Sequence, residues 1–79
     1  MIDYKETLAN IAKAIVDDPE QVTVTETESP SGHVTLALSV APDDMGKVIG
    51  KHGKIAQAIR QLMKTAASES GKKITVDIR

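Results

Sequence analysis

Apolar side chains recur along this chain with two different periods, and each change of period marks a new structural element. Residues 3–16 place their apolar side chains at helical spacing. Residues 21–27 and 33–40 instead alternate apolar and polar positions and are rich in β-branched side chains, as strands are. The segment 29–32, Ser-Pro-Ser-Gly, is a turn signal. The first half therefore predicts a helix followed by a β-hairpin.

The second half predicts two helices and a last strand. Residues 44–49 form a short helix in this interpretation, with Asp43 as its N-cap. A longer helix covers 54–69, and Gly71 follows it in the place typical of a residue that ends a helix. Residues 73–79 alternate again and form the third strand.

This order of elements, α-β-β-α-α-β, indicates an α+β fold over a single domain of residues 1–79. Each strand has one apolar face, so we expect a three-stranded mixed sheet with one face covered by the three helices. Two helices separate 33–40 from 73–79, a crossover long enough to make these strands parallel neighbours. The strand 33–40 then lies in the middle, antiparallel to 21–27.

The long helix has an apolar arc of about half its circumference, wider than contact with one sheet face requires. Four positions are expected to pack on the sheet: Ala56, Ile59, Met63 and Ala67. Four others are left as a possible dimer interface: Ile55, Ala58, Leu62 and Ala66. In the alternative interpretation the N-terminal helix covers these four, and the sequence does not choose between the two.

Charge is distributed unevenly, although the net charge of the 79 residues is only −1. Residues 1–42 hold two lysines against seven acidic residues, whereas residues 43–79 hold eight basic residues against four acidic ones. A local basic surface is a better guide to an anionic partner than the overall charge. Tyr4 is the only aromatic residue, which argues against domains that stack bases on aromatic platforms.

Cysteine is absent, which excludes disulfides and thiolate metal sites. We expect a soluble, cytoplasmic protein with no membrane partner, because there is neither a signal peptide pattern nor a long apolar run.

Two glycines bracket two residues that can carry positive charge in Gly50-Lys51-His52-Gly53, between the two predicted helices. Glycine lets the backbone bend sharply and approach a ligand closely, and a helix N-terminus favours anions. The segment therefore suggests a clamp for a phosphate backbone. The alternative is a tight turn between helices that binds nothing, and the spacing alone does not decide between them.

An enzyme is not expected, so we assign no catalytic residue, no metal and no cofactor. The glycine segment does not match a phosphate-binding Walker loop, since Ile55 stands where Ser or Thr would hold magnesium. Only His33 and His52 are available as histidines, and they suggest no Ser-His-Asp set.

The run Ala-Pro-Asp-Asp-Met-Gly-Lys-Val-Ile-Gly-Lys-His-Gly at 41–53, followed by Ala-Ile-Arg at 58–60, resembles type II KH domains. It is most similar to the KhpA family of small bacterial stand-alone KH proteins. This resemblance implies single-stranded RNA as ligand and an RNA-chaperone or post-transcriptional role. It also implies pairing with itself or with a larger KH-domain partner, KhpB, and a link to cell-wall homeostasis and cell length.

The resemblance and the residues together assign an RNA-binding site. Its members are Lys47, Ile49, Gly50, Lys51, His52, Gly53 and Lys54. The lysines supply charge, the glycines allow close approach of the sugar-phosphate, and Ile49 forms an apolar floor under the bases. For His52 the sequence leaves two equal alternatives, a contact with phosphate and an exposed loop position with no role. The alternative function is a protein–protein adaptor with a KH fold and little RNA binding of its own.

Overall fold

Helices and strands follow one another in the predicted order, α-β-β-α-α-β, in the computed structural model, which describes residues 3–69 and 71–78. The elements are α1 (Tyr4–Ile15), β1 (Thr23–Glu28), β2 (His33–Ser39), α2 (Met45–Ile49), α3 (Lys54–Glu69) and β3 (Lys73–Ile78). Single 3-10 turns at Pro19–Gln21, Pro42–Asp44 and Lys51–Gly53 connect some of them.

The sheet has the strand order β1-β2-β3, which confirms β2 as the central strand. β1 pairs antiparallel with β2, so that Val24 lies opposite Leu38. β3 pairs parallel with β2, so that Val76 lies opposite Leu36. The mixed sheet follows from the connections, because a short turn joins β1 to β2 while two helices join β2 to β3.

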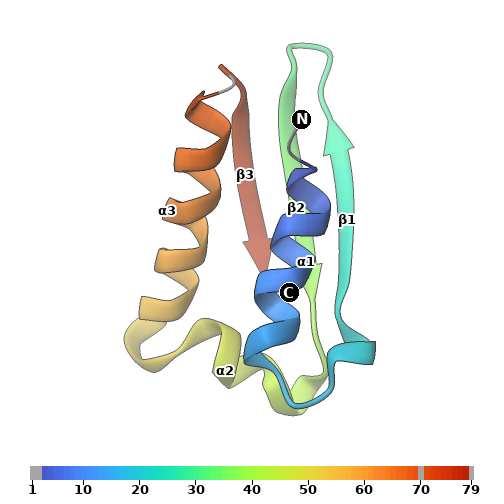
Figure 1. Cartoon of the computed structure of the whole chain (residues 1–79), viewed down its shortest axis with the longest axis vertical. Helices are drawn as coiled ribbons and strands as arrows, with labels where there is room; N and C mark the ends of the chain where they lie inside the picture. The colour runs from blue at the N-terminus through green and yellow to red at the C-terminus, as the bar shows by residue number, and fades with distance from the viewer. Residues whose placement is uncertain (1–2, 70, 79) are drawn as a thin grey trace.

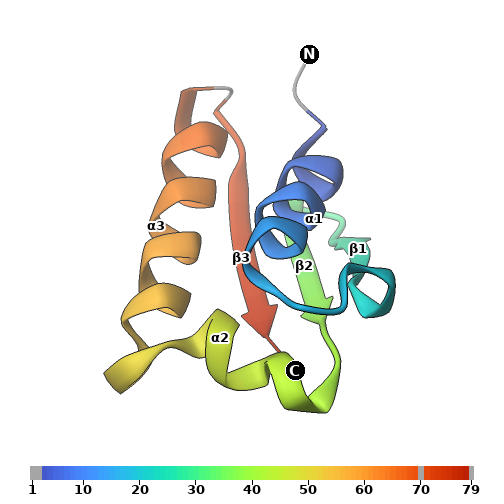
Figure 2. The same cartoon turned by 60° about the horizontal axis from the view of Figure 1, so that its bottom comes forward.

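The helices cover one face of this sheet and leave the other open (Figure 1). α1 packs on β1 and β2, and α3 lies beside β3, while α2 sits at the end of the sheet where β2 and β3 finish (Figure 2). Alternation along β2 sends one set of side chains into this layer and the other set to the open face. The largest fully buried side chains come from both layers: Leu8, Leu36, Leu38, Val48 and Met63.

Two predictions need correction, one for the start of the first strand and one for the N-cap of α2. The first strand begins at Thr23, not at residue 21, because a 3-10 turn at Pro19–Gln21 occupies the preceding residues. Asp43 as N-cap of α2 is wrong, since it lies exposed within the turn Pro42–Asp44, and Asp44 holds the N-cap position. The other predicted ends match the structure or differ from it by one residue, and residue 79 lies outside the described residues.

Gly71 ends α3 as predicted. Its φ is 71°, and its N–H donates to the Ser68 carbonyl at 3.1 Å. The N–H of Lys72 donates to the Ala67 carbonyl at 3.1 Å. This pair of bonds is the Schellman arrangement, which turns the chain sharply from α3 into β3.

Candidate functional site

The backbone between α2 and α3 turns through three residues in the left-handed region. Gly50 and Gly53 both have φ 73°, and His52 has φ 59°. Glycine adopts such angles without steric cost, and histidine is among the residues that tolerate them. The loop therefore uses glycine where the turn requires it, and holds the one non-glycine residue at its tip in an uncommon conformation.

Gly50 is also required by its packing. A Cβ atom at this position would lie 2.5 Å from Cγ1 of Ile55, closer than side chains can approach. The first turn of α3 thus packs directly against the loop backbone. Gly53 has open space around it, so glycine is favoured at this position only by its positive φ.

Hydrogen bonds leave donors at the tip of the loop. The N–H of Gly50 donates to the Gly46 carbonyl at 2.8 Å, and that of Gly53 donates to the Gly50 carbonyl at 3.3 Å. Within residues 3–69 and 71–78, the N–H groups of Lys51 and His52 have no hydrogen-bond partner. Both groups belong to exposed residues at the tip of the loop, where successive N–H groups suit an anion.

Positive charge surrounds these donors. The side chains of Lys51, His52 and Lys54 are exposed, and Lys54 begins α3, where the helix dipole also favours negative charge. Unpartnered N–H groups, a helix N-terminus and exposed cations together form an environment suited to phosphate.

Lys47 has a different environment from the other predicted lysines. Its ammonium is hydrogen-bonded to Asp17 Oδ2 and lies 3.6 Å from Asp44 Oδ1. Two carboxylates thus offset its charge, one from Asp17 beyond α1 and one from Asp44 at the start of α2. Its role as an RNA-binding residue stays a prediction, which this pairing weakens in favour of a structural role.

Asp44 is the buried partner in this group, with 3% of its surface exposed. Its carboxylate accepts hydrogen bonds from the N–H of Asp17 at 3.2 Å and from the N–H of Asp18 at 3.1 Å. These two residues directly follow Val16, the C-cap of α1, so Asp44 ties the end of α1 to the start of α2. Sequence reasoning missed this role, because no local pattern links residues 26 or 27 positions apart.

The pKa values of the group follow from these contacts. Burial raises the pKa of the Asp44 carboxyl, but the two N–H donors and the Lys47 ammonium together lower it more, so it lies below its ordinary value. The hydrogen bond that the Lys47 ammonium donates to Asp17 raises the pKa of Lys47, and the removal of Lys47 from water opposes this only in part. Both ionised forms are thus favoured at neutral pH.

Two apolar side chains flank Gly50 and reach solvent. Ile49 and Ile55 are each 38% exposed, whereas Val48 is fully buried in the core. Ile55, assigned from the sequence to a dimer face, packs against the loop backbone at Gly50. A single exposed isoleucine is common on a protein surface. Two of them on either side of a cationic turn form a small apolar surface beside the charge.

Arg60 is a residue that the sequence prediction did not include in the site. Its Nε donates to the carbonyl of Val76 at 3.2 Å, which links α3 to strand β3. Its position in the Ala-Ile-Arg run after the loop was the available signal. The bond places a guanidinium along the line where α3 and β3 meet.

The faces of α3 divide largely as predicted. The expected sheet-facing residues Ala56, Ile59, Met63 and Ala67 are all buried. On the other face Leu62 is 54% exposed and Ala58 is exposed, but Ala66 is half-buried against the core. The Tyr4 hydroxyl donates to the Ala66 carbonyl at 3.5 Å, so α1 covers this end of the face. The interpretation with the N-terminal helix therefore holds at Ala66 and not at Leu62.

Neither a metal-binding cluster nor a membrane-spanning helix is found in the described ranges. Residues 3–69 and 71–78 contain no group of three or more His, Cys, Asp or Glu side chains that could hold a metal ion. No helix within these ranges is long and apolar enough to cross a bilayer.

Comparison with known proteins identifies the fold and the family. Residues 5–78 match the model of the KhpA/KhpB KH domain. The chain is 52% identical over 75 residues to the RNA-binding protein KhpA of Caldanaerobacter subterraneus subsp. tengcongensis, covering 92% of this chain and 96% of that protein. It is 46% identical over 74 residues to the KhpA of Treponema pallidum, covering 94% and 91%.

A solved structure shares the fold at much lower identity. The crystal structure of Era in complex with MgGDPNP and nucleotides 1506–1542 of 16S ribosomal RNA superposes with a TM-score of 0.66 at 13% identity. The match covers 95% of this chain but only 28% of the Era chain. The resemblance stated from the sequence is confirmed, and the names of the relatives are those of binding proteins and not of enzymes. This chain belongs to the KhpA/KhpB KH-domain family.

Proposed function

We propose that this protein binds single-stranded RNA, with the sugar-phosphate backbone held by the loop from Gly50 to Gly53. The observation that supports this most strongly is the loop tip, where the unpartnered N–H groups of two exposed residues, Lys51 and His52, lie near Lys54. Its relatives are named RNA-binding proteins. Membership of the family adds support, since KH domains clamp about four nucleotides with such a loop.

The bases would lie over Ile49 and Ile55, on the side toward Arg60 and strand β3. Apolar contact there replaces the aromatic stacking that this chain lacks, since Tyr4, its one aromatic residue, is buried in the core. As the resemblance implies, the role would be that of an RNA chaperone or post-transcriptional regulator. A link to cell-wall homeostasis and cell length is part of the same implication.

Salt dependence tests the phosphate contacts. We expect fluorescence anisotropy to show that a single-stranded RNA 12-mer binds more weakly as salt rises, because bound counterions are released. Three phosphate contacts would give a slope of about −2 in log affinity against log salt, at about −0.7 per contact for single strands. A duplex of the same sequence is the control and should bind less well. No binding at low salt and high protein concentration would contradict RNA binding and favour the adaptor function.

We also propose that the protein works as a dimer, through Ala58 and Leu62 of α3 with Ile55 at the edge of the face. The supporting observation is Leu62, whose side chain is the most exposed of the large apolar residues described. A small alanine beside it allows a second helix to approach closely. The partner would be a second copy or a larger KH protein such as KhpB, and two loops on one strand would raise the effective concentration.

Replacing Leu62 with aspartate is expected to shift the protein from dimer to monomer in analytical ultracentrifugation, because a charge would then lie in the apolar contact. The fold should persist, since Leu62 is outside the core. Gln57→Asp, at an exposed position of the same helix, adds the same charge and is the control. A wild type that stays monomeric up to high concentration would rule out the homodimer.

A further inference from the structure

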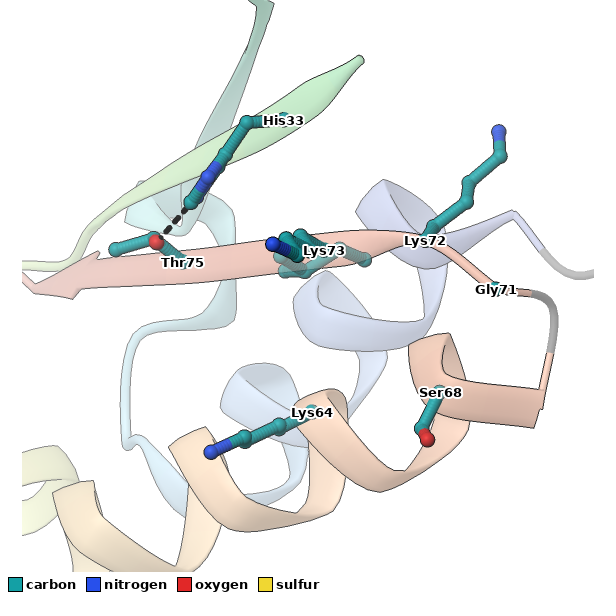
Figure 3. Close-up of a pocket in the computed structure, with 8 residues that line it drawn as sticks. His33, Lys64, Ser68, Gly71, Lys72, Lys73 and Thr75 are labelled. Carbon is teal, nitrogen blue, oxygen red and sulfur yellow. Dashed lines mark hydrogen bonds between the residues drawn. The ribbon is translucent and has the colours of Figure 1, made fainter. Parts of the chain in front are cut away.

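A cavity of about 620 Å³ lies at the end of α3 that is remote from the loop (Figure 3). Lys64 and Ser68 reach it from α3, and Lys72, Lys73 and Thr75 reach it from the start of β3. His33 of β2 completes the lining on the open face of the sheet. Figure 3 shows β3 passing between His33 on one side and Lys64 and Ser68 on the other. The cavity therefore wraps around an edge strand of the sheet.

The lining of this cavity is suited to an anion. Three lysines contribute to it, and no carboxylate does. His33 Nε2 and Thr75 Oγ1 are 2.6 Å apart, and their hydrogen bond holds the imidazole ring against β3. A neighbouring cavity of about 460 Å³ shares Lys72 and Lys73 but is also lined by Glu28, whose charge opposes an anion. The larger cavity is therefore the better anion site of the two.

Positive groups connect this cavity to the loop. Arg60 and Lys64 are four residues apart and so lie on one side of α3, the side on which Arg60 reaches the Val76 carbonyl of β3. They continue along the line where α3 and β3 meet toward Lys72 and Lys73. Sixteen residues of α3 span about 24 Å, so a strand held at the loop has to run the length of this helix to reach the cavity.

We propose that the cavity is a second phosphate site for the same RNA strand, used only by strands longer than the loop itself holds. This rests on the proposed function. The loop clamps about four nucleotides, and the nucleotides beyond them follow Arg60 and Lys64 to the cavity. There Lys72 and Lys73 pair with backbone phosphate as the strand crosses the edge of the sheet.

RNA length is the variable that tests this. We compare a tetranucleotide and a 12-mer of the same composition with wild type and Lys72→Gln/Lys73→Gln by anisotropy. The variant is expected to bind the 12-mer about 3- to 10-fold more weakly and the tetranucleotide unchanged, with the salt slope for the 12-mer reduced by about 1.4. Lys5→Gln/Lys13→Gln is the matched control, because it removes the same charge at exposed positions that line neither cavity.

The outcomes separate this inference from the function on which it rests. Equal losses for both RNAs would mean general electrostatics and would overturn the second site, as would no loss for either. A 12-mer that binds the variant normally, while inorganic phosphate alone shifts the NMR signals of Lys72 and His33, would make the cavity a free-anion site. If Lys51→Asp/His52→Asp leaves binding of both RNAs intact, the loop assignment fails instead.

Discussion

Replacing Lys51 and His52 together with aspartate is expected to abolish RNA binding while the fold stays intact. Both side chains are exposed at the tip of the loop, and neither contributes to the core. The change turns the charge around the two unpartnered N–H groups from positive to negative, so that phosphate is repelled where it would be held. Aspartate also tolerates the left-handed conformation that His52 adopts at φ 59°.

Anisotropy with a single-stranded RNA measures the loss, and circular dichroism with thermal unfolding checks the fold. The matched control is Lys5→Asp/Asn10→Asp, which makes the same change in net charge at two exposed positions of α1. Loss of binding in both variants would indicate that net charge alone matters. A folded loop variant with wild-type affinity would contradict the clamp.

The second large effect is expected at Asp44, where Asp44→Asn should lower the melting temperature by about 10 °C at neutral pH. Both carboxylate oxygens accept backbone N–H groups, from Asp17 and Asp18. An amide offers one acceptor oxygen, and its NH₂ group would face a donor and the Lys47 ammonium. One backbone N–H then loses its partner, and the connection from α1 to α2 weakens.

The effect of this substitution should depend on pH in a defined direction. The pKa of Asp44 is lowered from its ordinary value of 3.8, so its contribution to stability is fully present above that value. The contribution is lost as pH falls through the lower pKa of the folded state. The difference in melting temperature between wild type and variant is therefore expected to shrink below about pH 4. A difference of constant size from pH 7 to pH 3 would contradict this origin.

Asp43→Asn is the control for the same turn, since Asp43 is exposed and adjacent in sequence. It should leave the melting temperature nearly unchanged. Because α2 has only five residues and is followed directly by Gly50, weakening its anchor at Asp44 is also expected to loosen the loop. Reduced RNA affinity of Asp44→Asn, beside an unaffected Asp43→Asn, would show that coupling.

Much of the architecture could be predicted because its signals are local. The alternation in β2 identified the residues that face the helices, and the crossover of two helices required a parallel pair. The four α3 residues expected on the sheet are the four that are buried. Gly71 was recognisable as a helix end because a left-handed residue is needed there.

The charged contacts could not be predicted, because their partners are far apart in the chain. Lys47 looked like one more lysine near the glycines, yet Asp17, 30 positions away, pairs with it. The sequence pointed to Asp43 as the N-cap of α2, whereas Asp44 holds that position. Only the packing of α1 against α2 decided that Asp44 turns inward and Asp43 outward.

The sequence by itself determined the order of elements, the topology of the sheet and the glycine turn, since short-range periodicity and backbone sterics carry that information. The tertiary structure alone decided which charges are available. It paired Lys47 with two carboxylates, placed Ile55 against the loop, covered Ala66 with α1 and brought Lys64 to Lys72 and Lys73 around one cavity. The physical reason is that charge and burial depend on neighbours in space, which spacing along the chain does not specify.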